Sequence, residues 1–206
     1  MATHLLSRNL ISRRREEAVR LRPVIDPAAW KAADLDLDQS WIHPFSDTDI
    51  AELDALVASL EPRISDVLEI KREDIDLPVL GPRLAAIGDD IINGRGLALI
   101  RGVPVDRYTR LQTAIAFWCI GLIFGVPVSQ NAKGHLLGHV ADLGGTSLKN
   151  PKNRGYQTHD RLPYHCDSCD VVGLLCVHPS RSGGESTVTS SLNIYNEMLK
   201  RRPELV

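Results

Sequence analysis

His165 and Asp167, which flank Cys166, form the residue pair best suited to carry chemistry. In an extended segment, side chains two residues apart lie on the same face, so this imidazole and this carboxylate can bind one cation together. Two histidines and one carboxylate on one face of an octahedral iron leave three positions open for other ligands. A bare His-x-Asp pattern often arises by chance, and its simpler interpretation is an exposed histidine beside a turn aspartate. The surrounding sequence has to distinguish the two.

An ordered set of elements follows this pair. Val171–Val177 is a continuous apolar run, which predicts a strand buried on both faces and makes Cys176 a buried strand residue. Gly183-Gly184-Glu185-Ser186 then predicts a turn, and residues 186–189 alternate like a second strand. Residues 192–199 have helical spacing before Pro203.

This succession of His-x-Asp, apolar strand, Gly-Gly-x-Ser turn and helix resembles the Fe(II)/2-oxoglutarate-dependent dioxygenases of the taurine dioxygenase-like (TauD/TfdA, clavaminate synthase-like) family. The resemblance covers residues 95–206 and includes Gly125-Val126-Pro127, which is similar to the family's Gly-x-Pro stretch. It implies a double-stranded β-helix, or jelly roll, as the core. It also implies an oxidoreductase that uses Fe(II), O2 and 2-oxoglutarate to hydroxylate or oxidise a small metabolite, while 2-oxoglutarate is decarboxylated to succinate.

The resemblance also implies roles for individual residues. His165 and Asp167 would be two of the iron ligands, and Ser186 would help to hold 2-oxoglutarate at the hydroxyl position of the family's Gly-Gly-x-Thr motif. A serine can donate the same hydrogen bond as a threonine. Gln130 lies where some relatives place a substrate-contacting side chain. Asn131 and Gln157 are further candidates for substrate contact.

Two family features have no match in this sequence: the distal histidine ligand and the arginine that pairs with the far carboxylate of 2-oxoglutarate. About half of the barrel strands that the resemblance implies are also unmatched. An open half-barrel would expose strand edges and an apolar face, which favours self-association. We therefore expect a fragment, a truncated product or a subunit completed from elsewhere, with little or no turnover of its own. The alternative is a catalytically inactive relative that acts as a binding or interaction module.

Other patterns in the same region are weaker. Cys166-x-x-Cys169 has a spacing that can bind zinc or form a redox pair, but no second pair completes a zinc set, which favours two unpaired thiols. His135 and His139 would share one face of a strand. We interpret them as satisfied or exposed side chains rather than as a second metal site.

The elements that must position these residues fall into three regions: a peripheral N-terminal arm over 1–45, a helical region over 46–95 and the first part of the jelly-roll core over 96–206. Helices followed by strands around one buried helix predict an α+β fold, and the buried helix is expected to pack on a sheet. The periodicity predicts helices over 46–60, 84–92, 109–124 and 192–199, and strands over 97–100, 136–140, 171–177 and 186–189.

The composition limits the partners and the location. The 206 residues are 43% hydrophobic, enough for one domain with an ordinary core, and 24 basic against 26 acidic residues favour neither nucleic acid nor membrane as partner. A small-molecule substrate is expected instead. Four cysteines predict no disulfide framework and favour the cytoplasm. The alternative is a mitochondrial location, because Arg8, Arg13, Arg14 and Arg15 occur in an N-terminal stretch without acidic residues.

Overall fold

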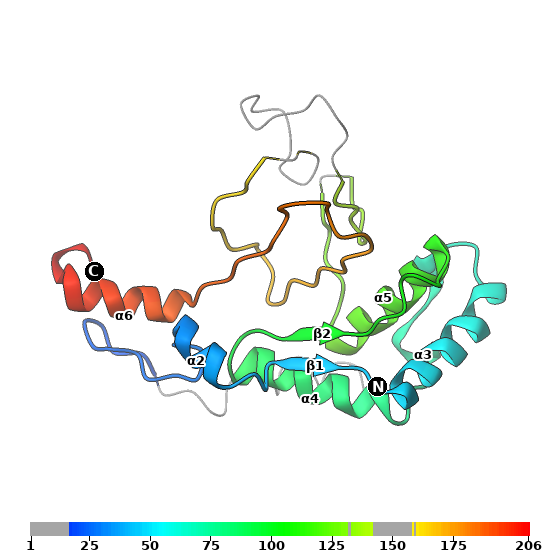
Figure 1. Ribbon diagram of the computed structural model, residues 1–206, viewed down its shortest axis with the longest axis horizontal. Helices are drawn as coiled ribbons and strands as arrows, with labels where there is room; N and C mark the ends of the chain where they lie inside the picture. Colours follow the sequence, from blue (N-terminus) through cyan, green and yellow to red (C-terminus); the bar gives the residue numbers. More distant parts are fainter. Residues whose placement is uncertain (1–16, 132, 142–157, 159) are drawn as a thin grey trace. The chain divides into compact units, whose positions relative to one another are not determined.

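The computed structural model describes residues 17–131, 133–141, 158 and 160–206 (Figure 1). The chain divides into two compact units, residues 1–126 with 173–206 and residues 127–172, and each is described by itself. Among the described residues, no helix is long and apolar enough to cross a membrane.

Three helices enclose the hydrophobic core of the first unit. They are α3 (Asp47–Leu60), α4 (Leu80–Asn93) and α5 (Arg110–Phe124). Helix α5 contacts both α3 and α4, and the side chains of Leu53, Leu84 and Ile115 in this core are completely buried. The expectation that α5 packs on a sheet is therefore wrong, because the apolar faces of two helices cover it instead.

Local capping explains where α3 and α5 begin. The Asp49 amide donates to Ser46 Oγ at 3.3 Å, and the Ser46 amide donates to Asp49 Oδ2 at 2.7 Å. Thr109 and Gln112 repeat this reciprocal arrangement at the start of α5, with distances of 3.2 and 2.9 Å. Each pair satisfies backbone amides that have no partner inside the helix. The predicted helices over 46–60 and 109–124 are thus confirmed.

Helix α4 begins at Leu80, earlier than the predicted Leu84, because a residue of another helix caps it. Glu52 of α3 accepts hydrogen bonds from the amides of Val79 and Leu80, at 2.9 and 2.8 Å. A carboxylate at this end is also favoured by the helix dipole. The cap lies 28 residues away in the sequence, so local periodicity does not reveal it.

Two short strands form the one sheet found among the described residues. Strand β1 (Ile42–Pro44) pairs in parallel with β2 (Leu99–Arg101), and His43 lies opposite Ile100. Strand β2 overlaps the strand predicted over 97–100. The remaining short elements are α2 (Ala32–Leu37), η1 (Glu61–Arg63), η2 (Val67–Glu69), η3 (Arg72–Asp74), α6 (Ser191–Arg201) and η5 (Pro203–Leu205).

The strands predicted over 136–140, 171–177 and 186–189 are absent from the described structure. A strand forms only where a neighbouring backbone exchanges hydrogen bonds with it, and no described segment pairs with these three. Val172 is 51% exposed and Leu174 is 73% exposed, so the prediction that 171–177 is a strand buried on both faces is wrong. Cys176 is likewise exposed rather than buried. The α+β class is confirmed, whereas the described residues contain two strands and no jelly roll.

Helix α6 is held by the N-terminal segment. The side-chain amide of Asn196 accepts a hydrogen bond from the Val24 amide at 2.7 Å and donates one to the Val24 carbonyl at 2.8 Å. The Ser190 hydroxyl, which also caps α6, donates to the Ala28 carbonyl. Asn196 is half-buried, and its side-chain amide pairs with both the N–H and the C=O of Val24 as a neighbouring backbone would.

Replacing Asn196 with alanine is expected to lower the free energy of unfolding by about 1–3 kcal/mol, because both polar groups of Val24 lose their partner. Urea denaturation followed by circular dichroism measures this change. Asn193 on the same helix is the matched control, since no hydrogen bond of its side chain is found in the described structure. Asn193→Ala should change stability by less than about 0.5 kcal/mol. Equal effects of the two substitutions would contradict the role of Asn196.

Candidate metal site

His165 and Asp167 lie close together in the second unit. His165 Nε2 is 3.8 Å from Asp167 Oδ1, and His165 Nδ1 is 2.8 Å from the carbonyl oxygen of Pro163. A carbonyl oxygen only accepts hydrogen bonds, so Nδ1 carries a proton and donates a hydrogen bond to the Pro163 carbonyl oxygen. Nε2, which lies near the Asp167 carboxylate, is then the ring nitrogen left to bind a metal when it is unprotonated. This is the orientation of a metal-binding histidine whose other ring nitrogen is fixed by a carbonyl.

The donor atoms of this pair fit a divalent cation such as Fe(II). One neutral imidazole nitrogen and one carboxylate oxygen match two members of the two-histidine, one-carboxylate iron set. Adjacent ligands of an octahedral cation at about 2.1 Å lie about 3 Å apart, so a closure of about 1 Å lets both bind one ion. The side chains are 54% and 53% exposed, which leaves room for further ligands. In the described part of the chain, no third histidine, cysteine or acidic side chain joins them.

Gln130 and Asn131, predicted to contact substrate, hold a local turn. The Gln130 amide donates to the His135 carbonyl at 2.7 Å, and Gln130 Nε2 donates to the Val128 carbonyl at 2.9 Å. Asn131 Nδ2 lies 3.1 Å from His135 Nδ1, and Asn131 Oδ1 accepts from the Lys133 amide at 3.0 Å. These contacts agree with the interpretation of His135 as a satisfied side chain. Gln157 lies outside the described residues.

Ser186 belongs to the first unit, whereas His165 and Asp167 belong to the second. It is exposed and follows a turn in which Gly183 and Gly184 have φ values of 72° and 78°. Side chains with a Cβ rarely adopt this left-handed conformation, so the two glycines permit the turn that the sequence predicted. The role of Ser186 in holding 2-oxoglutarate remains a prediction.

The four cysteines are free thiols. Cys166 is exposed and Cys169 is half-buried, where its thiol lies 3.5 Å from the Val171 carbonyl. Burial raises the pKa of the Cys119 thiol to about 12, with a smaller contribution from Asp74. Cys119 therefore stays protonated at neutral pH and acts as a core residue rather than as a nucleophile.

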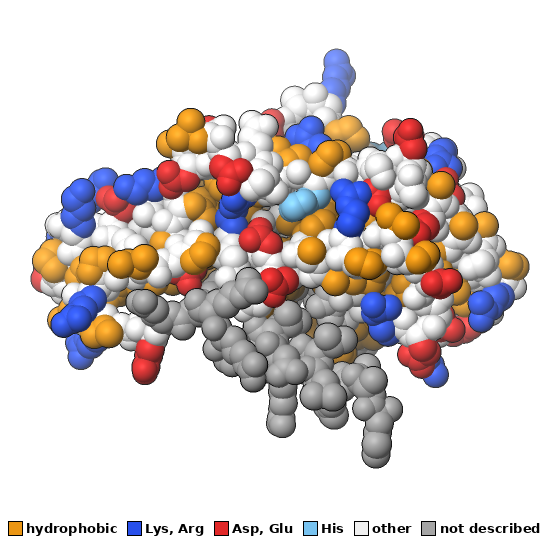
Figure 2. All heavy atoms as spheres, turned by 90° about the horizontal axis from the view of Figure 1, so that it is seen from below, with side chains coloured by type: hydrophobic (Ala, Val, Ile, Leu, Met, Phe, Trp, Pro, Cys, Tyr) orange, Lys and Arg blue, Asp and Glu red, His pale blue; other side chains and the backbone are white. Residues whose placement is uncertain are grey.

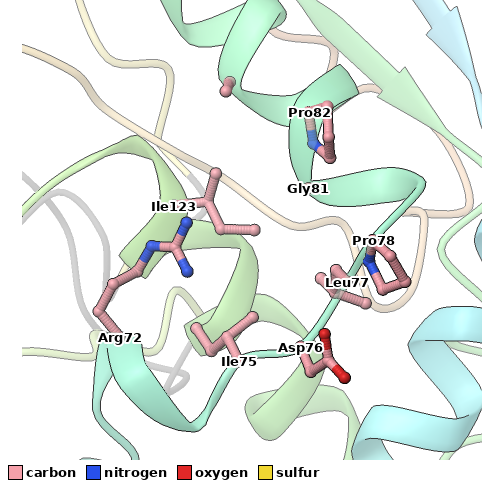
Figure 3. Close-up of a pocket in the computed structure, with 9 residues that line it drawn as sticks. Arg72, Ile75, Asp76, Leu77, Pro78, Gly81, Pro82 and Ile123 are labelled. Carbon is pink, nitrogen blue, oxygen red and sulfur yellow. The ribbon is translucent and has the colours of Figure 1, made fainter.

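Two grooves in the first unit contain none of the predicted site residues. Figure 3 shows one of them, where Arg72 and Ile123 point toward each other and Ile75 lies between Arg72 and Asp76. The other lies beside β1 and α4. Sequence motifs could not reveal either groove, because their residues come from segments that are far apart in the chain.

Sequence comparison identifies the family. The profile of the taurine catabolism dioxygenase TauD, TfdA family matches residues 56–206. The chain belongs to the TauD/TfdA family. This agrees with the resemblance inferred from His165, Asp167 and the turn that follows them.

Two relatives illustrate how much of a TauD/TfdA protein this chain represents. It is 30% identical over 185 residues to FR-33289 synthase of Streptomyces rubellomurinus, covering 90% of this chain and 55% of that protein. It is 29% identical over 187 residues to the taurine hydroxylase-like protein SAT17 of Stachybotrys chartarum, covering 88% of this chain and 49% of that protein. The chain thus spans about half the length of these curated relatives.

Proposed function

We propose that this chain supplies two iron ligands, His165 and Asp167, to an Fe(II)/2-oxoglutarate-dependent dioxygenase. The observation that carries the proposal is the approach of His165 Nε2 to Asp167 Oδ1 at 3.8 Å, with the imidazole oriented by Pro163. Membership of the TauD/TfdA family supports it independently. The family also supports a jelly-roll core, in which the unpaired segments 171–177 and 186–189 would find partner strands.

When bound, iron and 2-oxoglutarate would supply the activation of O2 that oxidises an unactivated carbon. The residues of this chain would hold and orient the reactants. A neutral His165 and an ionised Asp167 bind the cation, and the Ser186 hydroxyl donates a hydrogen bond to 2-oxoglutarate. Gln130, Asn131 and Gln157 are the proposed substrate contacts. The substrate class would be a small carboxylated or amino-acid-like metabolite, and the proposed location is the cytoplasm, with the mitochondrion as the alternative.

A second candidate function is an inactive relative that binds a partner or a second copy of itself. The exposure of the apolar side chains of Leu174 and Val188 favours it, because both lie in segments without a backbone partner in the described structure. Unpaired extended backbone beside apolar side chains is a surface on which another strand can add.

The purified 206-residue chain distinguishes these functions when it is incubated anaerobically with Fe(II) and 2-oxoglutarate. Ligands that bind the native state raise its stability by mass action, by about 1.4 kcal/mol at ten times the dissociation constant. We expect a stabilisation by Fe(II) that His165→Ala abolishes. After oxygen is admitted, we expect little or no succinate by nuclear magnetic resonance. Absence of stabilisation with both ligands would favour the second candidate, and rapid succinate release would show that the chain is catalytically sufficient.

A further inference from the structure

Helix α6 makes few contacts with the other elements of the first unit. Among the described helices and strands it contacts only η5, which follows it directly. None of its side chains is buried, and those of Ile194 and Met198 are 46% and 37% exposed. Figure 2 shows hydrophobic side chains on the surface at the left end of the molecule, where α6 lies in Figure 1. Burial of apolar surface, the main force that holds helices in a fold, therefore contributes little to the position of α6.

Residues 24–31, which we call the N-terminal strap, run beside α6 and provide its polar partners (Figure 1). Asn196 exchanges two hydrogen bonds with the backbone of Val24, and the Ser190 hydroxyl donates to the Ala28 carbonyl. In the described part of the chain, every hydrogen bond or ion pair found between α6, with its cap, and another segment ends on the strap. The position of α6 therefore depends on these polar contacts.

The strap is in turn attached to the end of α4. The indole N–H of Trp30 donates to the Arg95 carbonyl at 2.9 Å, two residues after the helix ends. Gly96 lies close to the strap, since a Cβ placed on Gly96 would come within 3.7 Å of the Ala28 Cβ. The strap thus connects α6 to the helical core.

The position of α6 also limits the position of Ser186, the proposed contact of 2-oxoglutarate. Ser186 precedes Ser190, the cap of α6, by four residues. Because an extended chain spans at most about 3.6 Å per residue, Ser186 lies within about 14 Å of Ser190. Ser190 is itself buried and bonded to the strap. Any shift of the start of α6 must therefore move the point to which the Ser186 segment is attached.

We propose that the N-terminal strap is a positioning device for cosubstrate binding: it holds α6, and through the start of this helix it sets where Ser186 can reach 2-oxoglutarate. This inference rests on the proposed function, in which Ser186 donates a hydrogen bond to 2-oxoglutarate. Docking of α6 and binding of the ligand are then linked, because a ligand that binds only the docked state must also favour that state. Asn196 is accordingly a positioning residue, which acts through the strap and α6 rather than by contact with the ligand.

Amide hydrogen exchange of the full 206-residue chain, measured anaerobically with Fe(II) present, tests the docking of α6. Local opening of α6 exposes its amides without unfolding the helical core. Asn196→Ala should speed the exchange of these amides about tenfold, because the docked state loses two hydrogen bonds. Asn193→Ala, on the same helix, should change it less than about threefold.

Arg83→Met separates local opening from global unfolding. It breaks an ion pair between α3 and α4 and leaves the contacts of the strap intact, so α6 should exchange as in the natural chain although the core is less stable. The docking step is overturned if Asn196→Ala leaves the exchange of α6 unchanged. It is also overturned if Arg83→Met speeds that exchange as much as Asn196→Ala does, because α6 would then open only when the whole unit unfolds.

Addition of 2-oxoglutarate to the same samples tests the link to the ligand. At ten times its dissociation constant, a ligand that binds only the docked state slows the exchange of α6 about tenfold. We expect this slowing in the natural chain and a smaller one in Ser186→Ala. If 2-oxoglutarate slows exchange in α3, α4 and α5 but not in α6, the coupling is overturned while cosubstrate binding stands. If it slows no amide, the proposed function fails and the coupling is overturned with it.

Discussion

Replacing His165 or Asp167 with alanine is expected to weaken Fe(II) binding by about 100-fold or more. Loss of a residue that merely orients a metal ligand costs roughly 10–100-fold in affinity, so loss of a ligand should cost at least the upper end of this range. Anaerobic titration with Fe(II), followed by calorimetry, measures the change. Both ligands bind in their deprotonated forms, so the affinity should also fall as the pH is lowered.

Residues near the pair provide matched controls for this titration. Asp170→Asn removes a nearby carboxylate, and His139→Ala removes an exposed imidazole of the same unit. Both should bind Fe(II) within about twofold of the natural chain, because adventitious surface ligands contribute little. Cys166→Ser tests whether the thiol between the two ligands takes part. A similar loss in the controls, or unchanged binding in His165→Ala, would refute the assignment.

Replacing Arg83 with methionine is expected to lower the free energy of unfolding by about 3 kcal/mol. The side chain of Asp49 is completely buried, and Arg83 is its ion-pair partner. Removing one partner of a buried pair leaves an uncompensated charge, which costs about 3–5 kcal/mol. We expect the lower end of this energy range because Arg83 is partly exposed and because Ser46 still donates two hydrogen bonds to Asp49. Urea denaturation at neutral pH measures the change.

Two further variants serve as controls: a double substitution that removes both charges of the buried pair, and a substitution that breaks an exposed ion pair. Asp49→Asn combined with Arg83→Met removes both charges and keeps an oxygen acceptor for Ser46, so it should recover most of the lost stability. Arg107→Met breaks the pair between Arg107 and Asp54, which lie 2.6 Å apart with side chains 54% and 33% exposed. The free energy of unfolding should fall by at most about 1 kcal/mol in this variant. Equal losses for Arg83→Met and Arg107→Met would contradict a special role for the buried charge.

The accuracy of the sequence-based predictions depended on how local the responsible interactions are. The start of α3 was predictable because Ser46 and Asp49 are three residues apart and satisfy each other's amides. The start of α4 was not, because its cap comes from Glu52 on another helix. The apolar run over 171–177 has the composition of a strand, but a strand also needs a partner backbone that periodicity cannot supply.

In the candidate site, too, the local features were predictable from the sequence and those that depend on the folded chain were not. The spacing of His165 and Asp167 and the family resemblance identified the pair, and the structure brings the two side chains together. The Pro163 carbonyl that orients His165 depends on the path of the loop backbone, which no motif encodes. The groove beside β1 and α4 was missed for a related reason. Its lining comes from residues 40–43 and 83–95, two stretches that meet only in the folded chain.

The attachment of α6 to Val24 also bears on the order of folding during synthesis. Helices α3, α4 and α5 lie between residues 47 and 124, so their mutual contacts can form while later residues are still being added. The two hydrogen bonds between Val24 and Asn196 join residues 172 positions apart. This contact cannot form until Asn196 has left the ribosome, and closing so long a loop is slow. The N-terminal segment is therefore made early but can dock on α6 only after residue 196 has been synthesised.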